Sequence, residues 1–200
     1  MEVAGPLSGR RRPPYPRFTS FTRSLERFMA LRDVLHYPDP RLKLVSEPVI
    51  EVTDEIRELA RDMIDVMYDE PGIGLAAPQV GASIRMFVID TEWGDEEIGK
   101  HPTVVLNPEI SDPEGKITWD EGCLSVPDYN ANVERDETIT LRGTDLDGKP
   151  IEERAEGLRA VCIQHEVDHL DGVLFIDRIS RLKRSLYAKK RKKQLSEEQE

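Results

Sequence analysis

The sequence contains little cysteine and no long apolar run. Two cysteines in 200 residues are too few for a disulfide framework. No apolar stretch approaches the roughly 18 residues that a membrane-spanning helix needs, and no internal repeat is found. The start of the chain also lacks the apolar segment of a secretory signal. We therefore expect a protein of the reducing cytoplasm that does not enter a membrane.

Positive charge is scarce except at the two ends of the chain. The net charge is −11, yet six arginines accompany two glutamates in residues 1–28, and nine lysines or arginines accompany three glutamates in residues 178–200. The middle is therefore strongly acidic and repels nucleic acid. We expect no sequence-specific binding of nucleic acid. The basic C-terminal tail is either a solvated helix face or a contact for a phosphate-rich partner such as the ribosome.

Length and composition predict one domain with an extension at each end. Residues 1–28 include Arg10-Arg11-Arg12-Pro13-Pro14 and show no core pattern, so we predict a disordered extension. An organellar transit peptide and a true start at Met29 remain open as its origin. Residues 29–177 are predicted to form the folded domain, and residues 178–200 a basic helix or tail.

Hydrophobic periodicity predicts an α+β fold. Thr53 is a candidate N-cap for an amphipathic helix that Pro71-Gly72 ends. Strands are predicted over residues 84–90, 103–106 and 133–142, with Asn107-Pro108 ending the second and a hairpin turn at Asp147-Gly148. Residues 158–172 predict a buried helix. After it comes a basic helix with Ile179, Leu182 and Leu186 on one stripe. We predict antiparallel or mixed β-sheets packed around the buried central helix, with a C-terminal helix.

The buried helix carries the pattern His-Glu-x-x-His. His165 and His169 are four residues apart, which places both imidazoles on one helical face with their Cβ atoms about 5–6 Å apart. Both rings can then bind one metal ion, and Glu166 is placed to act as a general base on a water molecule. The plain alternative is a pair of histidines packed in a core.

A catalytic metal site needs a third protein ligand. Phe175 occupies the position of the last histidine in the metzincin pattern, and later glutamates occur only at 197–200, so two common endopeptidase arrangements are absent. Cys162 precedes His169 by seven residues, about 10.5 Å along the helix axis, which is too far for one ion to bind it together with both histidines. Cys123, on a separate segment, is the remaining candidate.

Three stretches together resemble the motifs of the peptide deformylase family, in their order and with typical spacing. They are Gly72-Ile73-Gly74-Leu75-Ala76-Ala77-Pro78-Gln79, Glu121-Gly122-Cys123-Leu124-Ser125 and Gln164-His165-Glu166-Val167-Asp168-His169. The form Glu-Gly-Cys-Leu-Ser resembles that of the bacterial class with a helical C-terminus. The resemblance covers about residues 31–177, and residues 1–28 have no counterpart in the usual family pattern.

The resemblance implies removal of the N-formyl group from the initiator methionine of nascent peptides, with residues 29–177 as the catalytic metallohydrolase domain. It implies one Fe(II) per chain, replaceable by zinc, nickel or cobalt, with three ligands: Cys123, His165 and His169. Glu166 would transfer the proton, and the Gln79 amide and the Leu124 backbone N–H would stabilise the oxyanion. Gly74 would let the substrate backbone come close. The methionine pocket would be lined by Ile73, Leu158, Val161, Cys162 and His165.

Two other functions are compatible with parts of the pattern. A general metalloendopeptidase is disfavoured because its usual third ligand is missing. A structural-metal protein that binds ribosomal RNA through the basic tail would need four protein ligands, and the sequence offers no fourth candidate.

Overall fold

The structure is a computed structural model that describes residues 33–95 and 97–197. The predicted disorder of residues 1–28 lies outside the described residues. The first long element is α2 (Asp54–Asp69), which begins after the predicted N-cap Thr53 and ends before Pro71-Gly72, as expected. Its buried residues recur at helical spacing and form one apolar face: Leu59, Ala60, Met63, Val66 and Met67.

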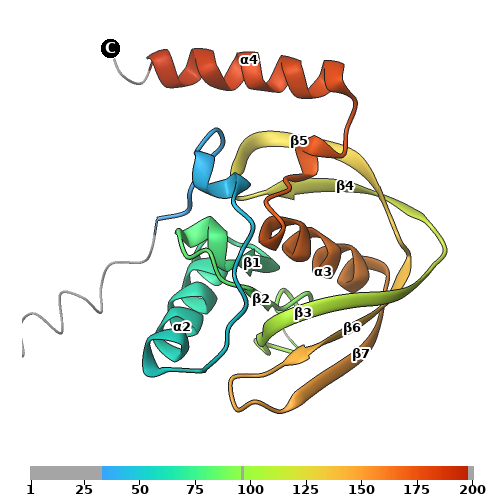
Figure 1. Cartoon of the computed structure of the whole chain (residues 1–200). Helices are drawn as coiled ribbons and strands as arrows, with labels where there is room; N and C mark the ends of the chain where they lie inside the picture. Colours follow the sequence, from blue (N-terminus) through green and yellow to red (C-terminus); the bar gives the residue numbers. More distant parts are fainter. Residues whose placement is uncertain (1–32, 96, 198–200) are drawn as a thin grey trace, which may run out of the picture. The chain divides into compact units, whose positions relative to one another are not determined.

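Five strands form an antiparallel sheet in the order β1–β2–β3–β6–β7 (Figure 1). They are β1 (Gly74–Ala76), β2 (Met86–Ile89), β3 (Thr103–Glu114), β6 (Thr138–Thr144) and β7 (Pro150–Glu156). All four residues of β2 are buried. Met86 and Val88 belong to the core cluster that includes α2, whereas Phe87 and Ile89 belong to a second cluster. Alternate residues of a strand face opposite sides, so this sheet is covered by apolar residues on both faces.

Strand β3 is longer than the sequence predicted. The prediction that Asn107-Pro108 ends it is wrong, because the strand continues to Glu114. The register with β6 shifts between Leu106 and Glu109, and Asn107 has a φ of 49°. The strand therefore accommodates the proline in a bulge and then resumes pairing.

The predicted strand over residues 133–142 is wrong in its bounds, because a turn divides it. Strand β5 (Val126–Arg135) ends before this turn and β6 begins after it. β5 pairs with β4 (Ile117–Cys123) in a separate two-stranded antiparallel sheet. The predicted turn at Asp147-Gly148 is confirmed as the link between β6 and β7.

Helix α3 (Gly157–Leu170) lies between the five-stranded sheet and the β4–β5 hairpin (Figure 1). It begins directly after β7, and Gly157 makes this change of direction at a φ of 56°, which glycine adopts without steric cost. The prediction of an α+β fold around a buried central helix is confirmed, and its sheets contain only antiparallel pairs. Among the described residues, no helix is both long and apolar enough to cross a membrane.

Short 3₁₀ helices η1 (Pro40–Lys43), η2 (Ala77–Val80) and η3 (Phe175–Asp177) connect these elements, and α4 (Arg181–Glu197) follows η3. The C-terminal helix is confirmed, but the apolar stripe read from the sequence is not its buried face. Leu182 and Leu186 are 71% and 61% exposed, whereas Tyr187 is 3% exposed. The Tyr187 ring packs on Tyr37 and Tyr129, with ring centroids 5.8 and 4.8 Å apart. An aromatic contact with distant parts of the chain therefore decides which face of α4 is buried.

We expect Tyr187→Ala to lower the free energy of unfolding by about 3 kcal/mol, because it removes a buried aromatic ring. Leu182→Ala on the same helix should change it by less than about 0.5 kcal/mol, as exposed positions do. Urea denaturation of both variants measures the difference. Equal losses would contradict the burial pattern of α4.

Candidate metal centre and substrate cavity

Three side chains bring their metal-binding atoms to one point. The ligand atoms of Cys123, His165 and His169 lie within 4.8 Å of one another, and Cys123 Sγ is 3.2 Å from His169 Nε2. The two histidines come from consecutive turns of α3, and the cysteine comes from the end of β4. Metal bonds of about 2.0–2.3 Å hold neighbouring ligand atoms about 3.5 Å apart. The donor set therefore fits a single transition-metal ion.

His165 is oriented by Glu121, two residues before the cysteine. Its Nδ1 lies 2.9 Å from Glu121 Oε2. A carboxylate accepts this hydrogen bond, so the proton of the neutral ring is on Nδ1 and the lone pair of Nε2 is free for a metal. Burial lowers the pKa of His165, but hydrogen bonds to Cys123 and Glu121 outweigh it and raise the pKa. A bound cation would compete with that second proton. Burial lowers the pKa of His169, which favours its neutral, metal-binding form.

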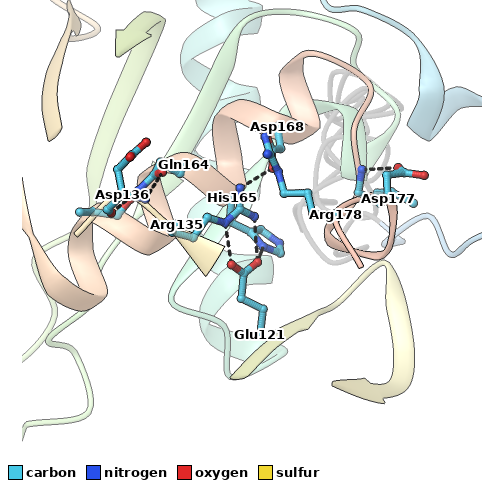
Figure 2. A network of polar contacts seen from close by, with 10 residues as sticks. Glu121, Arg135, Asp136, Gln164, His165, Asp168, Asp177 and Arg178 are labelled. Carbon is cyan, nitrogen blue, oxygen red and sulfur yellow. Dashed lines mark hydrogen bonds and ion pairs between the residues drawn. The ribbon is translucent and has the colours of Figure 1, made fainter. Parts of the chain in front are cut away.

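Glu121 belongs to a buried network of charges (Figure 2). Arg135 donates to both oxygens of Glu121, at 2.6 and 2.9 Å, and to Asp168 Oδ2 at 2.6 Å. Arg178 pairs with Asp168 from the other side. Burial raises the pKa of Glu121, but the hydrogen bonds from Arg135 and His165 outweigh it and lower the pKa to about 2. The carboxylate is therefore held in its charged form, as the orientation of His165 requires.

Glu166 is 3% exposed, follows His165 on α3 and lines the same cavity as Cys123 and His165. Burial raises its pKa to about 7, although His165 lowers it. Within residues 33–95 and 97–197, its Oε2 has no hydrogen-bond partner. A buried carboxylate oxygen without a partner is costly, which points to a small polar molecule as its natural partner. A Cβ atom at Gly74 would be 2.5 Å from Glu166 Oε1, so only glycine allows the β1 backbone to pass this close.

Gln79 and Leu124 are neighbours of Cys123, the first in space and the second in the chain. Gln79 is 2% exposed, and its Oε1 accepts from the Ala76 backbone at 2.8 Å. That bond aims Nε2 at Ser125 Oγ, 3.2 Å away, and at Cys123 Sγ, 3.7 Å away. Leu124 follows Cys123 in the turn between β4 and β5. Two potential donors, one amide side chain and one backbone N–H, therefore flank the cysteine.

These groups open onto a cavity of about 600 Å³. All the predicted site residues except the buried His169 line it: Ile73, Gly74, Gln79, Cys123, Leu124, Leu158, Val161, Cys162, His165 and Glu166. Burial raises the pKa of the Cys162 thiol, whose Sγ lies 3.7 Å from the Ile73 carbonyl oxygen. Cys162 is thus a packed thiol on the cavity wall, as the helix spacing predicted. The structure brings the predicted residues together, but their catalytic roles stay predictions.

Sequence reasoning missed the partners that hold the site in place. Glu121 belongs to one of the three motifs, but the sequence reasoning gave it no role. Metal-binding histidines commonly donate to a carboxylate, so an acidic residue in such a motif is a candidate partner. Arg135 and Asp168 gave no signal of their pairing, because they are 33 residues apart in the chain. Trp119 and Tyr129, which also line the cavity, had no periodic pattern around them.

Comparison with known proteins identifies the family. A family model of polypeptide deformylases matches residues 31–185. The peptide deformylase of Alkalilimnicola ehrlichii is 53% identical over 165 residues, which cover 82% of this chain and 91% of that protein. That of Novosphingobium aromaticivorans is 50% identical over 183 residues, with 82% and 97% covered.

Solved structures agree with this assignment. The crystal structure of a peptide deformylase from Legionella pneumophila has a TM-score of 0.76 at 44% identity, covering 84% of this chain and 98% of that one. The Ehrlichia chaffeensis peptide deformylase in complex with actinonin has a TM-score of 0.76 at 38% identity, with 83% and 98% covered. The chain therefore belongs to the peptide deformylase family, metal-dependent hydrolases that remove the N-formyl group from the amino-terminal methionine of newly made proteins.

Proposed function

We propose that Cys123, His165 and His169 hold the metal ion of this deformylase and that Glu166 is its general base and acid. The observation that carries the proposal is the meeting of three metal-binding atoms beside a buried carboxylate oxygen that has no partner among the described residues. A divalent ion in this place supplies Lewis acidity, which lets water lose a proton near neutral pH. Three protein ligands, rather than the four of a structural site, are typical of catalytic metal sites.

In this proposal, Glu166, Gln79 and Leu124 carry the steps of amide hydrolysis. Glu166 accepts the proton of the attacking water and passes it to the amine that leaves as the carbon–nitrogen bond breaks. Gln79 Nε2 and the Leu124 N–H donate to the oxygen of the formyl group while it carries negative charge. Formate and a peptide with a free amino terminus result, so atoms and charge balance.

The apolar part of the cavity suits the methionine side chain. Ile73, Leu158 and Val161 line it together with the thiol of Cys162, and an unbranched thioether fits such a pocket. Gly74 adds a wall without a side chain, along which the substrate backbone can lie.

Glu166→Gln tests the proton-transfer role. The amide keeps the size of the side chain but cannot accept the proton, so we expect kcat on a formyl-Met peptide to fall by about 10²–10⁴-fold. Metal content should stay at one ion per chain, because Glu166 is not a ligand. An unformylated peptide of the same sequence is the control substrate, and its cleavage would indicate an endopeptidase. Activity within threefold of wild type would refute the role.

We propose ferrous iron as the native metal, with zinc, nickel or cobalt as substitutes, because thiolate and imidazole donors suit this series. Elemental analysis of protein purified without air should find one iron per chain. We expect Cys123→Ala to lose both the metal and most activity. Cys162→Ala should keep the metal and lose roughly 1–2 kcal/mol of stability or substrate fit, as small core truncations do. If Cys162→Ala empties the site and Cys123→Ala stays loaded, the ligand assignment is wrong.

We also propose that residues 29–177 form the catalytic domain, of which residues 29–32 lie outside the described residues, and that the basic C-terminal tail of residues 178–200, which contains α4, contacts the ribosome in the cytoplasm. The support is the row of exposed lysines on α4, which includes Lys189, Lys190 and Lys192. Because α4 packs on the body through Tyr187, a charge change tests this contact more cleanly than a truncation.

The double variant Lys189→Glu/Lys192→Glu should weaken co-sedimentation with ribosomes in low salt severalfold, since fewer phosphates are neutralised. Turnover of a short formyl-Met peptide should not change. A control with the same change of net charge is Lys116→Glu/Lys149→Glu, outside α4. Equal ribosome binding by wild type and both variants would leave α4 as a solvated helix face.

A further inference from the structure

One wall of the cavity is the segment Gly72–Gly74, in which two glycines flank Ile73, and its carbonyl groups are hydrogen-bonded to residues that do not line the cavity. All three residues of this wall segment line the cavity. The Gly72 carbonyl oxygen accepts a hydrogen bond from Trp93 Nε1 at 2.8 Å, and the Ile73 carbonyl oxygen accepts one from the Asp90 backbone at 2.9 Å. Neither tie takes part in the chemistry described above.

The indole of Trp93 is itself fixed by its neighbours. It meets the ring of Tyr68 edge to face, with centroids 5.5 Å apart and an interplanar angle of 76°, a favourable aromatic geometry. The ammonium of Lys100 lies 4.1 Å from the Tyr68 centroid and 5.9 Å from the Trp93 centroid, within the range of a cation–π interaction. The N–H that reaches Gly72 therefore has a defined direction.

Asp90 anchors this cluster to the sheet. It follows β2, is 3% exposed, and accepts from the Tyr68 hydroxyl at 2.6 Å and from the His101 backbone at 2.7 Å. Burial and the Asp90 carboxylate raise the pKa of Tyr68, so the hydroxyl remains a donor at neutral pH. A short chain of contacts thus runs from a buried carboxylate through Tyr68 and Trp93 to Gly72.

We propose that Trp93 is a positioning residue for substrate binding, which holds the Gly72–Gly74 wall at the place where the formylated peptide lies along it. The inference rests on the proposed function of the cavity. Gly74 leaves no room for a Cβ atom beside Glu166 and Cys162, so a small movement of the wall changes the space in which the substrate backbone lies. Tyr68 acts through Trp93, because its ring and its bond to Asp90 set the position of the indole.

Trp93→Phe in the iron-loaded enzyme tests the proposal, because phenylalanine keeps an aromatic ring and loses the N–H. KM for a formyl-Met tripeptide should rise about fivefold, because binding must then restore the position of the wall at a cost similar to the contribution of the lost hydrogen bond. kcat should stay within twofold, because the interaction serves bound substrate and transition state alike. Metal content should not change. A KM within twofold of wild type, or a loss confined to kcat, would overturn the proposal.

Two further variants separate positioning from general destabilisation. Asn107 Nδ2 donates to the Val49 carbonyl oxygen at the same 2.8 Å, and Asn107 does not line the cavity. Asn107→Gly, which suits the positive φ there, should therefore lower the melting temperature without raising KM. Tyr68→Phe by itself should raise KM, but it should raise KM little further when combined with Trp93→Phe. Additive effects on KM would show that Tyr68 does not act through the indole.

The outcome also distinguishes this inference from the proposed function. If wild type deformylates the tripeptide and Trp93→Phe matches it in KM, only the positioning role fails. If wild type does not deformylate it, the proposed function fails first.

Discussion

The geometry of the candidate metal centre depends on one buried guanidinium. Arg135 has 2% of its side chain exposed and pairs with Glu121 on β4 and Asp168 on α3. Replacing a buried ion pair by apolar residues often costs little, but removing one partner leaves an uncompensated charge and costs about 3–5 kcal/mol. The network therefore says little about the stability of the protein, but it restricts how β4 and α3 lie relative to each other. It fixes the β4–β5 hairpin against α3 and, through Glu121, fixes which nitrogen of His165 is free.

The apolar layers explain how so polar a cluster stays in place. β2 separates two cores, one on α2 and one on α3, so the sheet beneath the site is packed from both sides. α3 in turn is covered by the hairpin. In this setting a carboxylate such as Glu166 is desolvated, which raises its pKa to about 7 and places it where it can both accept and return a proton at neutral pH.

Much of the candidate site could be predicted because its residues are close in sequence or occur in recognisable motifs. His165, Glu166 and His169 follow from helical spacing alone. Cys123 remains as the third candidate because Cys162 is too far from His169 along the helix for one ion to bind both. Predictions failed where contacts between distant residues decide. The bulge at Asn107, the turn that divides residues 133–142 and the buried face of α4 all depend on partners that periodicity does not show. Periodicity also gave no sign of the roles of Arg135 and Trp93. Arg135 pairs with residues 14 and 33 positions away in the chain, and Trp93 bonds to a residue 21 positions away.

The division of the ligands between two elements has a consequence for the whole fold. Two of the proposed ligands lie on α3 and the third lies at the end of β4, so an ion bound to all three would join layers that the Arg135 network and apolar contacts also connect. Beside these layers, Glu166 Oε2 is buried with no partner among the described residues, which costs about 1–3 kcal/mol. Such a cost is tolerable only because the surrounding core holds this side chain in position. The same packing that leaves the oxygen without a protein partner keeps it free to interact with a small polar molecule, so the cost in stability and the accessibility of Glu166 have one physical origin.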